Sequence, residues 1–93
     1  MVMDKKQQFE NVFKCKWSTM VLDQVSSGTK QPGWLLRSIP GLSKKVMYQR
    51  LKKLERFGYI KRRLVQEKPL IVFYTPTVLG RRAYQIIKMI EKL

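Results

Sequence analysis

The chain has 93 residues, of which 44% are hydrophobic and 11% aromatic. This length allows one domain, the apolar content is too high for a disordered tail, and no apolar run is long enough to cross a bilayer. Twenty Lys and Arg against six Asp and Glu leave a net charge of +14, which favours phosphate polyanions or anionic lipid as partners.

The same composition excludes several kinds of chemistry. The chain has no histidine and a single cysteine, Cys15, which excludes histidine-based triads, the usual histidine-containing zinc sites and an intrachain disulfide. Its carboxylates form no evident acid–base pair, so we predict neither an enzyme nor a protein that holds a metal or another cofactor. The first residues lack the pattern of a secretory signal, and we expect a cytoplasmic, nucleoid-associated protein.

Three helical segments are predicted in the first half of the chain. From Asp4 to about Val25 the apolar residues recur at steps of three and four, which predicts one long helix or two abutting helices. Pro32 is placed for the first turn of a short helix, and Ser43 for the N-cap of a longer helix that runs to about Phe57. Because only the turn 40–42 separates these two, they indicate a helix-turn-helix.

The second half predicts a hairpin and a last helix. Residues 59–65 and 70–74 favour β-structure, and the turn 66–69 between them predicts an antiparallel pair. Thr77 is placed to cap a final helix with one apolar stripe. We therefore predict an α+β, mainly helical fold in a single domain over residues 1–93.

The helix that starts at Ser43 has two different faces. At about 100° per residue, Met47, Leu51 and Leu54 share the face expected to lie in the core. The other side carries groups that hydrogen-bond to base edges or phosphates, although a solvated helix face would have the same polarity. The predicted DNA-reading residues are Ser43, Lys44, Lys45, Tyr48, Gln49 and Lys52.

Positive charge is concentrated on this helix and on the hairpin. Residues 44–63 hold nine Lys and Arg and one acid, Glu55, so they supply eight of the fourteen net charges. We predict that Arg62, Arg63 and Lys68 hold the DNA backbone or the minor groove. Because side chains alternate along a strand, Arg62 faces away from Lys61 and Arg63, so at least one of these three basic residues has a structural role.

Both terminal segments, 1–15 and 77–93, carry more apolar surface than one small core is expected to cover. Such a surface in a soluble protein usually meets a partner. A membrane-bound amphipathic helix is disfavoured, because the charge maximum lies away from these segments. The residues predicted to form a dimer interface are Phe9, Val12, Phe13, Tyr84, Ile87 and Ile90.

Several motifs resemble those of one family of regulators. Lys16-Trp17, Pro40-Gly41-Leu42-Ser43, Gln49-Arg50-Leu51 and Leu79-Gly80 occur at the intervals typical of the HxlR transcriptional regulators, relatives of the MarR group. The resemblance implies a winged helix-turn-helix that forms two-fold dimers through its terminal helices. Family members that sense oxidants carry a cysteine about a dozen residues before the Lys-Trp pair, a place that here lies near Asp4.

The sequence thus predicts a homodimeric regulator that binds specific sites in double-stranded DNA. A non-specific architectural DNA-binding protein and a helical interaction module remain as alternatives. The sequence leaves the roles of two residues undecided. Cys15 is either a small core residue or a thiol sensor, since Lys14 and Lys16 flank it, and Trp34 is either exposed or packed on a neighbouring subunit.

Overall fold

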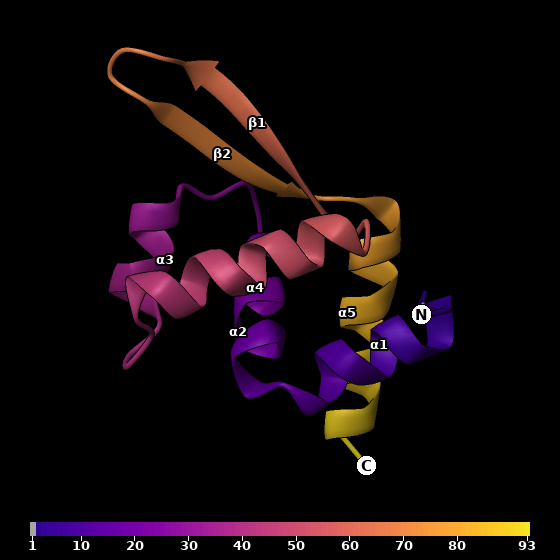
Figure 1. The fold of residues 1–93 in the computed structure, drawn as a ribbon. Coiled ribbons are helices and arrows are strands. Elements are labelled where there is room, and N and C mark those ends of the chain that lie inside the picture. The colour runs from indigo at the N-terminus through magenta and orange to yellow at the C-terminus, as the bar shows by residue number, and fades with distance from the viewer. Residues whose placement is uncertain (1) are drawn as a thin grey trace.

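The computed structural model describes residues 2–93, which form five α-helices and one two-stranded antiparallel sheet. This arrangement confirms the predicted α+β, mainly helical fold (Figure 1). In chain order the elements are α1 (Lys5–Lys14), α2 (Lys16–Ser26), α3 (Pro32–Ser38), α4 (Lys44–Arg56), β1 (Ile60–Gln66), β2 (Ile71–Pro76) and α5 (Val78–Glu91).

The first helical segment is two abutting helices and not one. Cys15 has an extended backbone, with φ −102° and ψ 109°, and it both ends α1 and begins α2. The start of α1 is fixed by a capping box, in which the Asp4 carboxylate accepts from the Gln7 N–H at 2.8 Å and the Gln7 side chain accepts from the Asp4 N–H at 2.9 Å. The break at Cys15 lets α1 turn away from the axis of α2 (Figure 1).

Helix α2 is the centre of the core. It packs against α1, α4, α5 and β2, and its Val21, Leu22 and Val25 are fully buried. Leu35 of α3 and Met47, Leu51 and Leu54 of α4 are fully buried in the same cluster. Because α4 lies across α2, its opposite face is left on the surface of the molecule (Figure 1).

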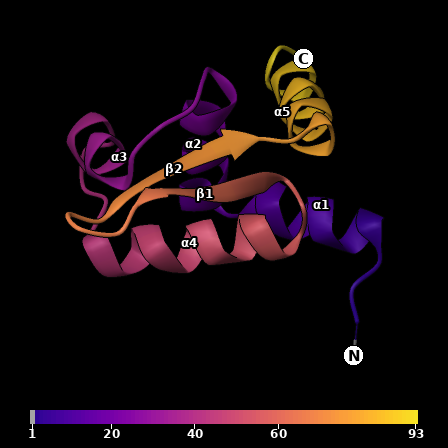
Figure 2. The same ribbon diagram turned by 90° about the horizontal axis from the view of Figure 1, so that it is seen from above.

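The two strands form a hairpin whose tip projects away from the helices (Figure 1). The register pairs Ile60 with Pro76 and Arg62 with Tyr74, so β2 runs two residues further than the sequence predicts. Viewed from above, the hairpin lies along α4 (Figure 2). Lys30 adds one more pair at the outer side of β2, with backbone hydrogen bonds of 2.9 and 2.8 Å to Tyr74.

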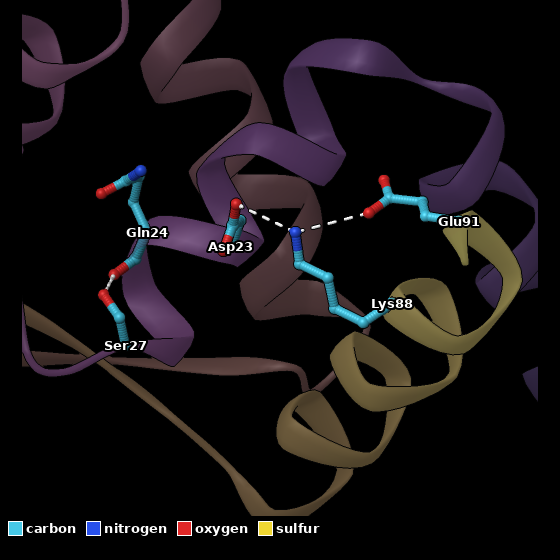
Figure 3. Close-up of polar contacts among 5 residues, drawn as sticks. All are labelled: Asp23, Gln24, Ser27, Lys88 and Glu91. Carbon is cyan, nitrogen blue, oxygen red and sulfur yellow. Dashed lines mark hydrogen bonds and ion pairs between the residues drawn. The ribbon is translucent and has the colours of Figure 1, made fainter.

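Helix α5 is fixed at both ends. At its start the Thr77 hydroxyl accepts from the Gly80 N–H at 3.0 Å, which confirms Thr77 as the N-cap. Gly80 lies directly on the Tyr59 backbone, and a Cβ atom there would overlap the Tyr59 carbonyl. Near its other end Lys88 Nζ lies 3.6 Å from Asp23 of α2 and 3.4 Å from Glu91, which links α5 to α2 (Figure 3).

Two residues of the predicted dimer interface are buried within the single chain. Val12 is 0% exposed and Ile87 is 1% exposed, and both belong to the core of the single chain. Their side chains are therefore not available to a second copy, because residues of their own chain already cover them. Phe9 and Tyr84 are partly buried against the core, whereas Phe13 and Ile90 are exposed.

Candidate nucleic-acid interface

A tight turn and a side-chain cap set the start of α4. Gly41 has φ +82°, a left-handed conformation that glycine adopts without strain, and it turns the chain between α3 and α4. The Ser43 hydroxyl then accepts from the Val46 N–H at 3.1 Å, as the sequence predicts for an N-cap. Lys44 and Lys45 occupy the first turn, where no acidic residue stands. Their charge adds to the positive end of the helix dipole and makes this tip an anion-attracting point.

The two faces of α4 are separated as the sequence predicts. Met47, Leu51 and Leu54 are 0% exposed and lie in the core. The predicted reading residues are exposed and share the outer surface of the helix start and its first three turns, and these are Ser43, Lys44, Lys45, Tyr48, Gln49 and Lys52.

Of the three hairpin residues predicted to hold DNA, Arg62 lies near α4, the helix predicted to read the bases. Arg62 and its cross-strand partner Tyr74 lie on the face of the hairpin that is turned to the core. Together with Tyr48 of α4 and Gln31 they line a hollow of about 250 Å³. Burial raises the pKa of Tyr74, and the charge of Arg62 acts against this rise. Arg62 is exposed and lines the same hollow as Tyr48 of α4.

Arg63 and Lys68, the other two hairpin residues predicted to hold DNA, are exposed as Arg62 is, but they lie elsewhere on the hairpin. Arg63 pairs with Phe73 and points to the face opposite Arg62. Lys68 lies in the turn, where the Gln66 amide donates to the Lys68 carbonyl at 3.0 Å. The structure therefore brings Arg62 to the hollow that Tyr48 also lines, while Arg63, on the opposite face, and Lys68, in the turn, do not line it.

Lys30 is a basic residue of this region that the sequence patterns do not reveal. Its Nζ lies 4.3 Å from the centre of the Trp34 ring, which is partly buried against the core. Trp34 is therefore neither fully exposed nor free to pack on a subunit with its whole ring. The pairing of Lys30 with Tyr74 joins residues far apart in the chain, so no local pattern signals it.

Cys15 lies half-buried behind α4, at the junction of α1 and α2. Burial raises the pKa of its thiol, but the Ser18 hydroxyl and N–H and the charges of Lys53 and Arg50 outweigh burial and lower the pKa from 9.0 to about 7. The two cationic residues belong to α4. A substantial fraction of this thiol is therefore ionised near neutral pH.

Two other features are absent from residues 2–93. No three His, Cys, Asp or Glu side chains there come together to hold a metal ion. No helix of the described chain is long and apolar enough to cross a membrane.

Two helices joined by a tight turn, the second with an exposed basic face, and a basic hairpin beside them define a winged helix-turn-helix protein. The chain matches the family of HxlR-like helix-turn-helix proteins over residues 12–93, and it belongs to this family. The resemblance seen in the sequence motifs is confirmed.

Proteins similar to this chain are described as transcriptional regulators. The chain is 37% identical over 78 residues to an uncharacterised HTH-type transcriptional regulator of Synechocystis, a match that covers 84% of this chain and 58% of that protein. Among solved structures, a MarR-family transcriptional regulator from Porphyromonas gingivalis has a TM-score of 0.82 and 32% identity, with coverage of 99% and 93%. The reduced form of the regulator YodB from Bacillus subtilis has a TM-score of 0.84 at 24% identity, with coverage of 99% and 90%, which shows a shared fold.

Proposed function

We propose that this protein is a transcriptional regulator that binds specific sites in double-stranded DNA as a homodimer. The observation that carries the proposal is the exposed face of α4, which presents Lys44, Lys45, Tyr48 and Gln49 together while the opposite face is anchored in the core. A helix anchored in this way enters the major groove as one rigid body. A protein with this role works on the nucleoid in the cytoplasm.

The side chains on this face have distinct roles in the proposal. Lys45 donates to guanine O6 or N7, and Gln49 pairs with the N6 and N7 atoms of adenine. Ser43, Lys44, Tyr48 and Lys52 are exposed on the same side of the helix and hold phosphates, which sets the register of the helix on the duplex.

The hairpin supplies contacts that flank the reading helix. Arg63 and Lys68, exposed toward the tip, bind the backbone or enter the minor groove. Arg62 lies beside Tyr48 in the hollow of about 250 Å³, and there it fixes the hairpin relative to α4 and meets a phosphate. These contacts supply affinity more than sequence preference.

The homodimer is proposed to form through the exposed apolar residues of the terminal helices. Phe13 of α1 is 38% exposed and stacks on Phe9, while Met89 and Ile90 of α5 are 70% and 37% exposed. Apolar side chains grouped in this way on a small basic protein favour a partner surface of the same kind. Phe9 borders this surface and Val12 and Ile87 support it from within the core, whereas Tyr84 lies on another side of α5, beside Asp23 of α2.

The decisive experiment is the selection of bound duplexes from a random pool, combined with sedimentation of the free protein. The proposal expects a two-fold symmetric consensus with half-sites about one helical turn apart and a dimer in solution. A pool that stays random, with a ratio of specific to non-specific affinity near one, would instead indicate an architectural DNA-binding protein, which the net charge of +14 also favours.

A further inference from the structure

The end of the β1–β2 hairpin carries aliphatic side chains that the single chain leaves exposed. Leu64, Val65 and Leu70 are 44%, 57% and 66% exposed, and Pro69 beside Leu70 is exposed as well. Among residues 2–93, these three aliphatic side chains belong neither to the core cluster nor to the hydrophobic side chains packed against it. Because the hairpin projects away from the helices, the exposed apolar residues stand at the end of an arm (Figure 1).

The strand register places these side chains on both sides of the turn. Leu64 pairs with Val72 and Gln66 pairs with Ile71, so Val65 is the extra residue of a β-bulge in this hairpin. A bulge bends the strand and re-aims the side chain that it inserts. Leu70 stands directly before β2, on the other side of the turn. The hairpin therefore ends in an aliphatic tip, which consists of Val65, Pro69 and Leu70.

The charge around the aliphatic tip favours a polyanion as its partner. Residues 60–76 contain one acid, Glu67, and four basic residues, which are Lys61, Arg62, Arg63 and Lys68. The tip is continuous with the surface of α4, because Leu70 lines the same hollow as Arg62 and Tyr48. A duplex bound to α4 therefore passes the hairpin, and it offers phosphates to the cations and stacked bases to the apolar side chains.

We propose that the aliphatic tip is a wedge that enters the minor groove, partly unstacks one base step and kinks the duplex. This inference rests on the proposed function, since it concerns the same complex with DNA. Pro69 and Leu70 are of the residue types that proteins insert between base steps, and such insertions bend the duplex by roughly 20–90°. Arg63 and Lys68 hold phosphates beside the unstacked step.

The wedge creates a sequence preference at a position where no base edge is read. Pyrimidine–purine steps such as TA are easily unstacked, whereas A-tracts are stiff. Selected sites should therefore hold a flexible step at a fixed distance from each half-site that α4 reads. A hairpin that only follows the phosphates would show no such preference.

The test uses a duplex of about 40 base pairs that carries the selected site, with a fluorophore at each end and 2-aminopurine at the flexible step. Energy transfer between the ends reports bending, and 2-aminopurine fluorescence rises when the base unstacks. We expect the protein to bend this duplex by at least about 20° and to raise the fluorescence. A mismatch at the step lowers the cost of unstacking and should raise the affinity about tenfold.

Two leucines provide a matched pair of variants. Leu70→Ser removes the wedge and should leave the duplex nearly straight, with fluorescence near that of free DNA and equal affinity for matched and mismatched duplexes. Leu93→Ser makes the same change at a fully exposed residue far along the chain from the hairpin, and it should bend DNA as the parent protein does. Both positions are exposed, and thermal unfolding checks that each variant is folded.

The proposal is wrong if the protein binds the duplex tightly and leaves it straight and stacked, a result that keeps the proposed function intact. Equal bending by Leu70→Ser and Leu93→Ser would overturn it by assigning the bend to another part of the protein. Binding of phosphatidylglycerol vesicles that Leu70→Ser loses, with its DNA bending unchanged, would overturn it in favour of a membrane contact. Absence of binding to any duplex at low salt would contradict the proposed function as well.

Discussion

Arg62 and Arg63 are neighbours in the sequence with different surroundings in the structure. Both are exposed, but Arg62 faces Tyr74 and lines a hollow with Tyr48, whereas Arg63 lies on the opposite face of the hairpin. The alternation of side chains along a strand predicts that the two arginines face opposite sides, and the sequence predicts that at least one of Lys61, Arg62 and Arg63 has a structural role. Arg62 lies nearer α4, since it lines the same hollow as Tyr48, so we expect the removal of Arg62 and the removal of Arg63 to have different consequences.

Substitutions on α4 and on the hairpin should separate base recognition from backbone binding. Gln49→Ala and Lys45→Ala should each cost about 1–3 kcal/mol on the preferred site and relax the base preference there. Arg63→Ala should weaken binding to all duplexes alike, because a phosphate contact carries no sequence information. Affinities for the selected site and its single-base variants measure both effects. Equal losses on every duplex for the α4 variants would contradict the assignment of α4 as the reading helix.

The single thiol should titrate near neutral pH. Alkylation of Cys15 by iodoacetamide should rise through a midpoint at about pH 7 in the folded protein and at the ordinary value near 9 in urea. Because the folded pKa is the lower one, this group contributes stability above pH 9, and the contribution is lost as the pH falls through 7.

The Lys53→Met variant tests the cause of this shift. It removes one of the two α4 charges that lower the pKa, so the alkylation midpoint should move upward. Lys52→Met is the matched control, since the neighbouring side chain is exposed and is not among the groups that act on the thiol. An unchanged midpoint in Lys53→Met would contradict the electrostatic explanation.

At the scale of elements, local signals predict the starts of helices well. Ser43 and Thr77 cap α4 and α5 as predicted, and Pro32 begins α3 as predicted. The end of β2 and the pairing of Lys30 with Tyr74 could not be predicted, because both depend on partners distant in the sequence. The sequence did not decide between one N-terminal helix and two. The apolar period continues across Cys15, although the backbone at Cys15 is extended and interrupts the helix.

Gly80 should be required for the seating of α5. A Cβ atom at this position would overlap the backbone carbonyl of Tyr59, and backbone cannot move aside as a flexible side chain can. Gly80→Ala should therefore destabilise the fold by several kcal/mol, measured by urea unfolding. Gly33→Ala is the control, because a Cβ there has only an ordinary contact at 3.5 Å to Arg37 and should stabilise α3 by about 0.5–1 kcal/mol. Equal stability of the two variants would contradict the close approach of Gly80 to Tyr59.

At the scale of the whole molecule, the sequence predicted the architecture and the exposed face of α4, whereas it did not predict which apolar residues of the terminal helices are buried in their own chain. A helical stripe shows which residues are apolar and not which of them their own chain covers. Val12 and Ile87 lie in such stripes and are buried by α2 and the rest of the core, whereas Phe13 and Ile90 remain accessible. That distinction arises from packing between elements, which no local pattern contains.

Binding to DNA should depend strongly on salt. A dimer that neutralises roughly 6–10 phosphates should lose about 10³–10⁵ in affinity between 50 and 200 mM salt, because each neutralised phosphate releases a counterion. Lys68→Gln should lower the slope of log affinity against log salt by about 1 for each phosphate that the variant no longer neutralises. Lys92→Gln, an exposed change at the far end of the molecule, should leave the slope unaltered (Figure 1). A nearly flat dependence would contradict a DNA surface built from the basic cluster.

The proposed dimer makes a final prediction that joins the terminal helices to DNA affinity. Phe13→Glu and Ile90→Glu place a charge on side chains that are exposed in the single chain, so the fold should persist. In the dimer the same charge would lie unpaired in an apolar interface, and sedimentation should show a monomer. Affinity for a two-half-site duplex should then fall at least tenfold toward that for one half-site, since the two sites are no longer linked. Val78→Glu, at a 68% exposed position near the start of α5, is the control that should remain a dimer. If Phe13→Glu and Ile90→Glu both stay dimeric with unaltered affinity, the two copies meet through some other surface.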